Sequence, residues 1–234
     1  LTGIQLLAVV AETYFISRLG TDALAGVALV VPLVMLTQMM SAGAMGGGVS
    51  SAISRAIGAG DRDRAATLAL HAAMIGACAG ILFAVMMLVF GRTFYLLLGG
   101  RGDVLEQAMA YSQVLFSGAI AIWLVNTLAS VVRGTGDMRI PSVTLIGTAL
   151  VQIAVGGASG LGLFGLPALG MRGVAAGQLT AFALGAVFLA WWLIGGHSRL
   201  TLNFKGFEFQ RAMFVDILKV GAVSCLSPLQ TVLT

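Results

Sequence analysis

Residues 1–17, LTGIQLLAVVAETYFIS, form an apolar run that contains a single acidic residue, Glu12. A charged side chain at the middle of a membrane helix costs from about 2.5 to more than about 10 kcal/mol, so acids at such positions are rare and usually functional. Arg18, the next charged residue, follows six positions later, which places Glu12 about 9 Å deeper along a helix, inside the hydrocarbon layer. Glu12 is therefore either a protonated carboxyl that hydrogen-bonds to a neighbouring helix or the partner of a transported cation or proton.

Two further polar residues of this stretch, Thr2 and Gln5, share the helix face of Glu12. Gln5 precedes Glu12 by seven residues and follows Thr2 by three. At about 100° per residue all three fall on one side. The pattern predicts a helix with one polar seam on a lipid-like surface, and it makes Gln5 a candidate for the pathway of the ion or substrate.

The composition of the whole chain is that of a polytopic membrane protein. Of its 234 residues, 59% are hydrophobic and 9% charged, and the mean hydropathy is +1.00, whereas soluble domains carry about 25% charged residues. The formal charge of +4 would suggest nucleic-acid binding in a soluble chain, but the basic residues occupy short joints between apolar segments, as membrane orientation requires. Cys78 and Cys225 lie inside apolar runs, which indicates packing residues and neither a disulfide framework nor a metal site.

The apolar segments are expected to be helices, because backbone groups in lipid must be satisfied within the segment. Pro32 lies midway through the second segment, where it removes a backbone hydrogen bond and predicts a kink. Several pairs of glycines four residues apart predict closely packed helices. The segments are 1–17, 23–50, 65–90, 104–132, 140–163, 173–194 and 212–234.

The joints between segments predict the domain organisation and the orientation. The longest joint mixes basic and aromatic residues, as expected of a linker at the cytoplasmic surface. We therefore divide the chain into a transmembrane lobe (1–194), a linker (195–211) and the start of a seventh helix (212–234). Eight Lys and Arg residues lie in the joints after the second, fourth and sixth segments and four in the other joints, so the N-terminal side is expected in the cytoplasm.

Four of the junctions carry distinctive motifs. They are ETYFISRLG at 12–20 followed by ALAG at 23–26, SRAIGAGD at 54–61, RGTGD at 133–137 followed by Pro141, and LPALG at 166–170 followed by GVAA at 173–176. In this order, and at these junctions, the motifs resemble those of the multidrug and toxic compound extrusion (MATE) transporters over residues 12–180.

The resemblance implies an all-α integral membrane protein with a six-helix transmembrane lobe plus the start of a seventh helix, half of a twelve-helix pseudo-symmetric antiporter of the cytoplasmic membrane. Such antiporters export organic cations in exchange for protons or sodium ions by alternating access and use no cofactor. The implied partners are small organic cations, the lipid bilayer and the C-terminal lobe of the same full-length chain, and no nucleic acid. The family's acid in helix one, usually Asp, matches Glu12, which becomes the expected cation-coupling residue.

The fifth segment departs from the family pattern. The family often carries an Asn and, four residues later, an Asp that face the acid of helix one; the matching positions are Gln152 and Gly156. The second carboxylate is therefore absent, and a sodium ion prefers several oxygen ligands and more than one charge. A proton needs only one carboxyl, so the sequence favours proton over sodium coupling, with Gln152 retained as a pathway candidate.

Other polar residues at membrane depth are also pathway candidates. Asn126 lies on a helix where the family carries substrate-facing Asn residues, Gln178 matches a polar position near its cation site, and Thr180 follows closely. For each the alternative is a simple interhelical hydrogen bond; this alternative is as strong as a functional role for Asn126, Gln5 and Gln152, and stronger for Thr180. Architectural or gating roles are predicted for the junction: Gly134 and Gly136 permit a tight reversal, Asp137 caps the next helix, and Arg133 is not a substrate ligand.

Two rival functions remain at this point. A flippase of lipid-linked saccharides from the same superfamily would bind an anionic pyrophosphate and need Lys or Arg at mid-depth, where the first six segments have none. A membrane-embedded enzyme would need a catalytic constellation, and the chain has only His71 and His197 and no paired acids within one helix. Both rivals are weaker than an antiporter.

Overall fold

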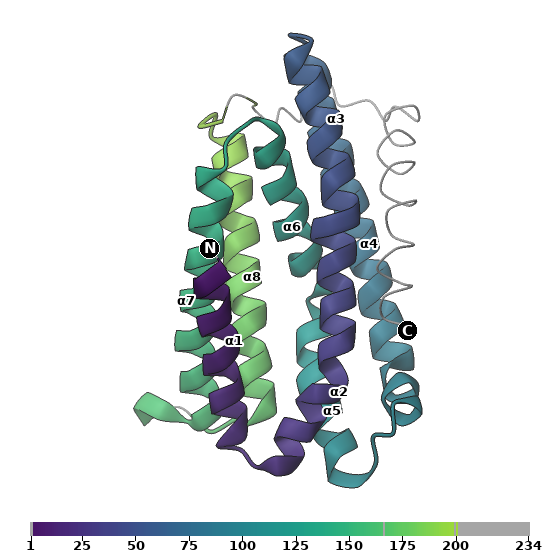
Figure 1. The fold of residues 1–234 in the computed structure, drawn as a ribbon, viewed down its shortest axis with the longest axis vertical. Helices are drawn as coiled ribbons and strands as arrows, with labels where there is room; N and C mark the ends of the chain where they lie inside the picture. Colours follow the sequence, from purple (N-terminus) through teal and green to yellow (C-terminus); the bar gives the residue numbers. More distant parts are fainter. Residues whose placement is uncertain (1, 166, 199, 201–234) are drawn as a thin grey trace. The chain divides into compact units, whose positions relative to one another are not determined.

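The computed structural model describes residues 2–165, 167–198 and 200, in which helices follow one another through short turns (Figure 1). Four helices of this part are long and apolar enough to cross a membrane, or five if the bent pair α5 and α6 counts as one span, and α1 is apolar but shorter. The all-α membrane fold predicted from the sequence is confirmed. In chain order the elements are α1 (Thr2–Ser17), α2 (Thr21–Gln38), the π-helix η1 (Met39–Met45), α3 (Gly46–Gly58), α4 (Arg62–Leu97), α5 (Gly102–Ser117), α6 (Ala119–Gly134), α7 (Arg139–Leu161), the 3-10 helix η2 (Leu163–Gly165) and α8 (Met171–Ile194).

The helix boundaries differ most from the predicted segments in the second and fourth segments. The second segment extends from α2 through η1 to the end of α3; Pro32 lies inside α2, and the helix type changes only at Met39. The fourth segment is broken at Gly118, between α5 and α6. The predicted seventh helix and the linker beyond Leu200 lie outside the described residues.

The junction between α6 and α7 explains three of the predicted architectural residues. Asp137 Oδ1 accepts hydrogen bonds from the backbone N–H groups of Arg139 at 2.8 Å and Ile140 at 3.3 Å, so the predicted cap is present. Gly136 has a φ of +87°, which favours glycine in the turn. Gly134 does something else: a Cβ there would lie 2.9 Å from the Cβ of Ile53, so its missing side chain lets α6 pack against α3.

The helices form two compact units. The first comprises Leu1–Val34, Ile81–Ala121 and Leu145–Gly185. In it α1, α7 and α8 lie side by side (Figure 1). The ring of Phe15 on α1 covers Gly157 of α7, and the backbone of Gly156 meets that of Gly177 on α8 so closely that a Cβ on Gly177 would overlap it. Small residues thus let the backbones approach, as in other membrane bundles.

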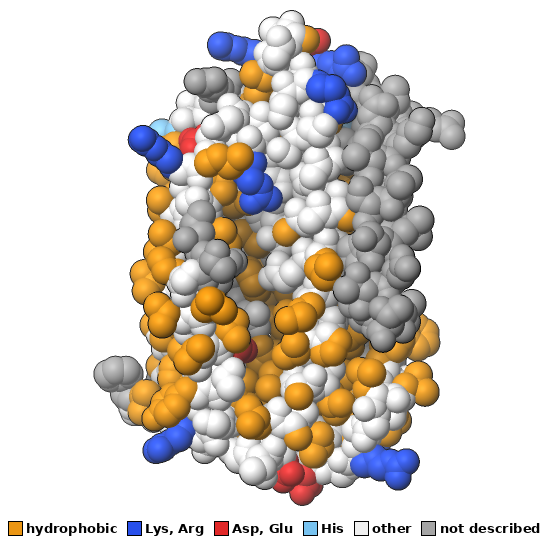
Figure 2. All heavy atoms as spheres, viewed as in Figure 1, with side chains coloured by type: hydrophobic (Ala, Val, Ile, Leu, Met, Phe, Trp, Pro, Cys, Tyr) orange, Lys and Arg blue, Asp and Glu red, His pale blue; other side chains and the backbone are white. Residues whose placement is uncertain are grey.

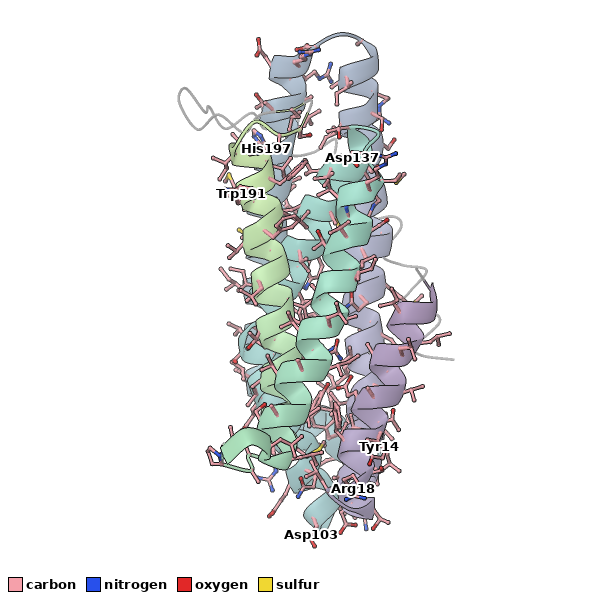
Figure 3. The ribbon with its side chains drawn as sticks, turned by 90° about the vertical axis from the view of Figure 1, so that its left-hand side faces the viewer. Tyr14, Arg18, Asp103, Asp137, Trp191 and His197 are labelled. Carbon is pink, nitrogen blue, oxygen red and sulfur yellow. The ribbon has the colours of Figure 1, made fainter. Side chains whose placement is uncertain are left out.

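The second unit comprises Met35–Gly80, Ile122–Thr144 and Ala186–Thr234, the last described at 186–198 and 200. Here α6 packs against its neighbours through glycines as well: Gly46 faces Ser130, and Gly76 of α4 faces Thr127. At the end of α8, the rings of Trp191 and His197 lie 5.0 Å apart between centroids (Figure 3).

The outward surfaces of these helices are apolar. Figure 2 shows hydrophobic side chains spread over the helices and basic side chains near their ends. On α1 the exposed residues include Leu6, Leu7, Val9 and Val10. Such a surface is stable against lipid tails and not against water, which agrees with an integral membrane protein.

Candidate functional site

The carboxylate of Glu12 is held by side chains from two other helices of the first unit. The hydroxyl of Tyr111, on α5, lies 2.5 Å from Glu12 Oε1, and the amide nitrogen of Gln152, on α7, donates to Glu12 Oε2 at 2.8 Å. The same Tyr111 hydroxyl lies 2.6 Å from Oε1 of Gln178, on α8. Four helices, α1, α5, α7 and α8, therefore meet in one hydrogen-bonded chain, the Glu12 cluster (Glu12, Tyr111, Gln152 and Gln178).

The close contact of α7 with α8 positions the two glutamines of this cluster. Gly156 and Gly177, whose backbones touch, stand one turn after Gln152 and one residue before Gln178. A side chain at Gly177 would push the two helices apart and draw the glutamines away from Glu12 and Tyr111. The glycine at position 156, where the resemblance led one to look for a second carboxylate, therefore belongs to the helix contact.

The hydrogens in the Glu12 cluster can be counted. Tyr111 has one hydroxyl hydrogen but two acceptor oxygens within reach, Glu12 Oε1 and Gln178 Oε1. If Glu12 is protonated, it donates to Tyr111, and Tyr111 donates to Gln178. If Glu12 is ionised, Tyr111 donates to Glu12, and Gln178 must turn its amide so that its NH₂ group faces Tyr111. The donor-to-acceptor direction of the hydrogen bonds between Glu12, Tyr111 and Gln178 thus depends on one proton.

Because the Glu12 cluster is largely buried, each of its polar atoms needs a hydrogen-bond partner within the protein. Tyr111 and Gln178 are 2% and 8% exposed, whereas Glu12 and Gln152 are half-buried. A buried polar atom that faces another acceptor with no hydrogen between them costs about 1–3 kcal/mol. The cluster therefore has two satisfied arrangements, one for each protonation state of Glu12.

The structure brings three of the predicted residues together, namely Glu12, Gln152 and Gln178, and adds Tyr111, which the sequence analysis did not single out. A signal for Tyr111 was available: it is the only tyrosine in the segment 104–132, and a tyrosine buried in a membrane helix needs a partner for its hydroxyl. Thr180 is not part of the cluster, because its side chain is exposed and donates to Ala176 O of its own helix. Gln5 belongs to α1, but its side chain lies outside the described residues.

Asn126 belongs to the second unit and to a separate polar cluster. Its Nδ2 donates to Gln38 Oε1 at 2.9 Å and to Ser41 Oγ at 2.8 Å. Ser41 is fully buried, while Gln38 and Asn126 are half-buried. Among the described residues no partner occupies Gln38 Nε2 or Asn126 Oδ1, so this amide pair offers a donor and an acceptor to a further polar group.

Arg133 lies one residue before the end of α6 and is half-buried. Its Nη2 donates to Ser130 Oγ at 2.6 Å, and no carboxylate of the described residues pairs with it. Asp137, four residues on, is engaged with backbone N–H groups instead. These contacts tie Arg133 and Asp137 to the packing and capping of α6 and α7.

Comparisons with known proteins agree on one family. The family profile MatE matches residues 4–156. Among curated proteins, the chain is 26% identical over 189 residues to a probable multidrug resistance protein NorM of Thermotoga maritima, covering 80% of this chain and 40% of that protein. It is also 26% identical over 219 residues to an FAD transporter of Shewanella oneidensis, covering 92% and 48%. The chain thus spans about half the length of these relatives.

Solved structures share the fold. A MOP superfamily transporter from Pyrococcus furiosus, for which a reversed polarity of the binding pocket suggests a different function, superposes with a TM-score of 0.90 at 29% identity, covering 97% of this chain and 50% of that one. The outward-facing conformation of a multidrug resistance MATE family transporter gives a TM-score of 0.88 at 28% identity, covering 99% and 51%. The architecture described here corresponds to half of each.

Proposed function

Because the chain belongs to the MatE family, that of the multidrug and toxic compound extrusion transporters, we propose that its full-length protein exports organic cations across the cytoplasmic membrane in exchange for protons, with Glu12 as the coupling carboxylate. The family is one of transporters and not of enzymes, so the enzymatic rival falls away. The observation that carries the proposal is the Glu12 cluster, in which an intramembrane carboxylate contacts Tyr111 and Gln152 from two other helices.

The chemistry of the cluster favours a proton over a sodium ion. The hydrogen bonds of Glu12 lead to a hydroxyl group, that of Tyr111, and to an amide, that of Gln152, and not to a second carboxylate. Glu12 Oε2 faces an N–H donor, Gln152 Nε2, and hard cations instead need several oxygens turned toward them. One proton on Glu12, by contrast, determines whether Tyr111 donates its hydrogen bond to Glu12 or to Gln178.

The proposed coupling step follows from the single hydroxyl hydrogen of Tyr111, which two acceptor oxygens share. Protonation of Glu12 makes it a donor to Tyr111, and the Tyr111 hydrogen then turns to Gln178 on α8. Loss of the proton returns that hydrogen to Glu12 and requires the Gln178 amide to reverse. An ion drives alternating access only if it binds one state more tightly than the other. We propose that the hydrogen-bonded chain provides this difference for a proton, because the protonation state of Glu12 changes the hydrogen bonding of Gln178 on α8.

The second polar cluster supports a role in substrate recognition. Gln38 and Asn126 together offer an amide NH₂ group and a carbonyl oxygen that no described residue occupies. We place Asn126 on the substrate pathway with Gln38 as its partner. A carbonyl oxygen and a half-buried site without a basic residue at mid-depth suit cationic or neutral polar substrates better than anions.

The position of the basic residues argues against a flippase of anionic lipid-linked saccharides. Such a substrate carries a pyrophosphate, which is bound by Arg or Lys side chains. Every arginine in the described part of the chain lies at a helix end or within five residues of one: Arg18, Arg55, Arg62, Arg64, Arg92, Arg101, Arg133, Arg139 and Arg172. Their distribution also supports the proposed orientation, because the α3–α4 and α6–α7 junctions hold five of them.

The test is efflux of ethidium from proteoliposomes that contain the full-length transporter, with a pH gradient or a sodium gradient imposed separately. Wild type and Glu12→Gln are compared, because glutamine keeps the size of the side chain and removes the titrating group. We expect efflux driven by the pH gradient alone and lost in Glu12→Gln. Efflux driven by sodium alone would assign the other ion, and gradient-driven efflux that survives Glu12→Gln would remove Glu12 from the coupling step.

A further inference from the structure

The candidate membrane span Thr21–Gly58 contains a seven-residue π-helix, η1 (Met39–Met45), between α2 and α3. The backbone N–H of Gly46 bonds to the carbonyl of Ser41, five residues earlier, instead of four as in an α-helix. Such segments are rare, and where they occur they often mark functional positions. Neither the proposed coupling at Glu12 nor the family assignment accounts for η1.

The π-helix η1 determines which residues of the span Thr21–Gly58 face α6. Ser41 contacts Asn126 of α6, and Gly46 contacts Ser130 of α6, one turn later on that helix. In an α-helix, two residues five positions apart stand about 140° from each other and cannot both face the same neighbour. In η1 the wider turn stacks them, so both contacts exist at once.

The side chain of Asn126, on α6, holds η1 in this form. Both hydrogens of Asn126 Nδ2 are used, one by Gln38 just before η1 and one by Ser41 within it. Ser41 Oγ donates in turn to Thr37 O at 2.7 Å. Ser130 Oγ donates to Asn126 O at 2.7 Å and lies where a side chain at Gly46 would have to be.

Two glycines, one within η1 and one just after it, have open space beside them. Gly43 and Gly47 are exposed, and a Cβ at either would meet nothing within 4 Å. At these two positions a turn of the segment about its axis drives no side chain into a neighbour, whereas the buried Ala44 and Met45 would have to repack. A fixed bulge would not need this freedom, whereas a segment that changes its hydrogen-bonding pattern would.

We propose that η1 is a register switch in the transport cycle, π-helical in the state seen here and α-helical in another, with Asn126 as the positioning residue that holds the π form and Ser130 as the residue that Gly46 packs against only in that form. If η1 becomes α-helical while Ser41 stays on Asn126, Gly46 turns away from Ser130, and α3 presents a different face to α6. The inference goes beyond the proposed function, because it involves neither Glu12 nor the identity of the coupling ion.

A disulfide tests the switch. In the full-length transporter with its native cysteines replaced, Gly46→Cys and Ser130→Cys are combined; a Cβ at Gly46 would lie 3.5 Å from the Cβ of Ser130, within the range for a disulfide. The control combines Gly76→Cys and Thr127→Cys, which join α4 to α6 without involving η1; their Cβ atoms would lie 3.3 Å apart, just below that range. Ethidium exchange across proteoliposomes without an ion gradient is measured before and after oxidation, so that the result does not depend on Glu12.

The expected result is a loss of exchange by at least about tenfold when the first pair is oxidised, recovery on reduction, and a change below about twofold for the control pair. Exchange at the wild-type rate with the first pair oxidised would overturn the switch. Deletion of Gly43 is the second variant, because it leaves Gln38 and Gly46 seven residues apart and on one face of an ordinary α-helix. It should fold with both contacts to α6 and fail to exchange ethidium; wild-type exchange in this variant would also overturn the proposal.

Discussion

The hydroxyl oxygen of Tyr111 lies 2.5 Å from Oε1 of Glu12, and it joins α5 to α1 across 99 positions of the sequence. Because Tyr111 is buried and also contacts Gln178, its single hydrogen cannot satisfy both neighbours. The protonation state of Glu12 therefore determines the hydrogen bonding of a residue on α8 that it does not touch. The first two predictions follow from this relationship.

Tyr111→Phe should uncouple transport from the pH gradient. The substitution keeps the ring but leaves Glu12 Oε1 and Gln178 Oε1 without the hydrogen between them, at a cost of about 1–3 kcal/mol. Gradient-driven ethidium efflux should fall by about tenfold or more. The matched control is Tyr14→Phe, which removes a hydroxyl from an exposed tyrosine of α1 (Figure 3). Equal efflux in the two variants would contradict a role for the Tyr111 hydroxyl.

Glu12→Asp should weaken coupling even though it restores the acid that is usual in the family. The shorter side chain withdraws the carboxylate by about 1.5 Å, so the contacts with Tyr111 and Gln152, now 2.5 and 2.8 Å long, cannot both remain hydrogen bonds. We expect pH-driven efflux to fall by about tenfold while some coupling remains, in contrast to its loss in Glu12→Gln. Efflux at the wild-type rate would indicate that α1 can move to compensate.

The sequence predicted the carboxylate and two other members of the Glu12 cluster because membrane burial makes polar residues conspicuous. Glu12, Gln152 and Gln178 stand out in apolar helices whatever the packing. Tyr111 was missed because only the packed structure brings its hydroxyl to Glu12. Thr180 was a weak candidate because its hydroxyl has a backbone acceptor available in its own helix, Ala176 O.

The departures in the fold have similar reasons. A proline is visible in the sequence, so a kink was predicted at Pro32; α2 continues past this residue, and the kink itself stays a prediction. The π-helix that follows has no residue signature of its own, because its contact with α6 at Asn126 holds it. Likewise, a glycine in the sequence does not show whether it serves a turn or a helix contact. Gly136 serves the turn after α6, whereas Gly134, two residues earlier, serves the contact of α6 with α3.

Gly177→Ala should destabilise the first unit. A Cβ there would overlap the backbone of Gly156, which cannot yield as a flexible side chain would, so we expect a loss of about 1–3 kcal/mol in the free energy of unfolding. Thermal denaturation in detergent measures it. Gly147→Ala, on α7, is the control, because that glycine is exposed and a Cβ there meets nothing within 4 Å. If both variants melt at the same temperature, the contact between α7 and α8 is looser than described here.

Asp137→Ala should lower stability through the start of α7. The Asp137 carboxylate accepts from the backbone N–H groups of Arg139 and Ile140, and the loss of such a cap costs about 1 kcal/mol. Asp137→Ser keeps an acceptor at the cap position and should recover most of the loss, which separates capping from the negative charge. The same melting experiment distinguishes the two. If Asp137→Ala and Asp137→Ser melt alike and both transport more slowly, the charge of Asp137 acts in the transport cycle, and the junction between α6 and α7 is part of a gate.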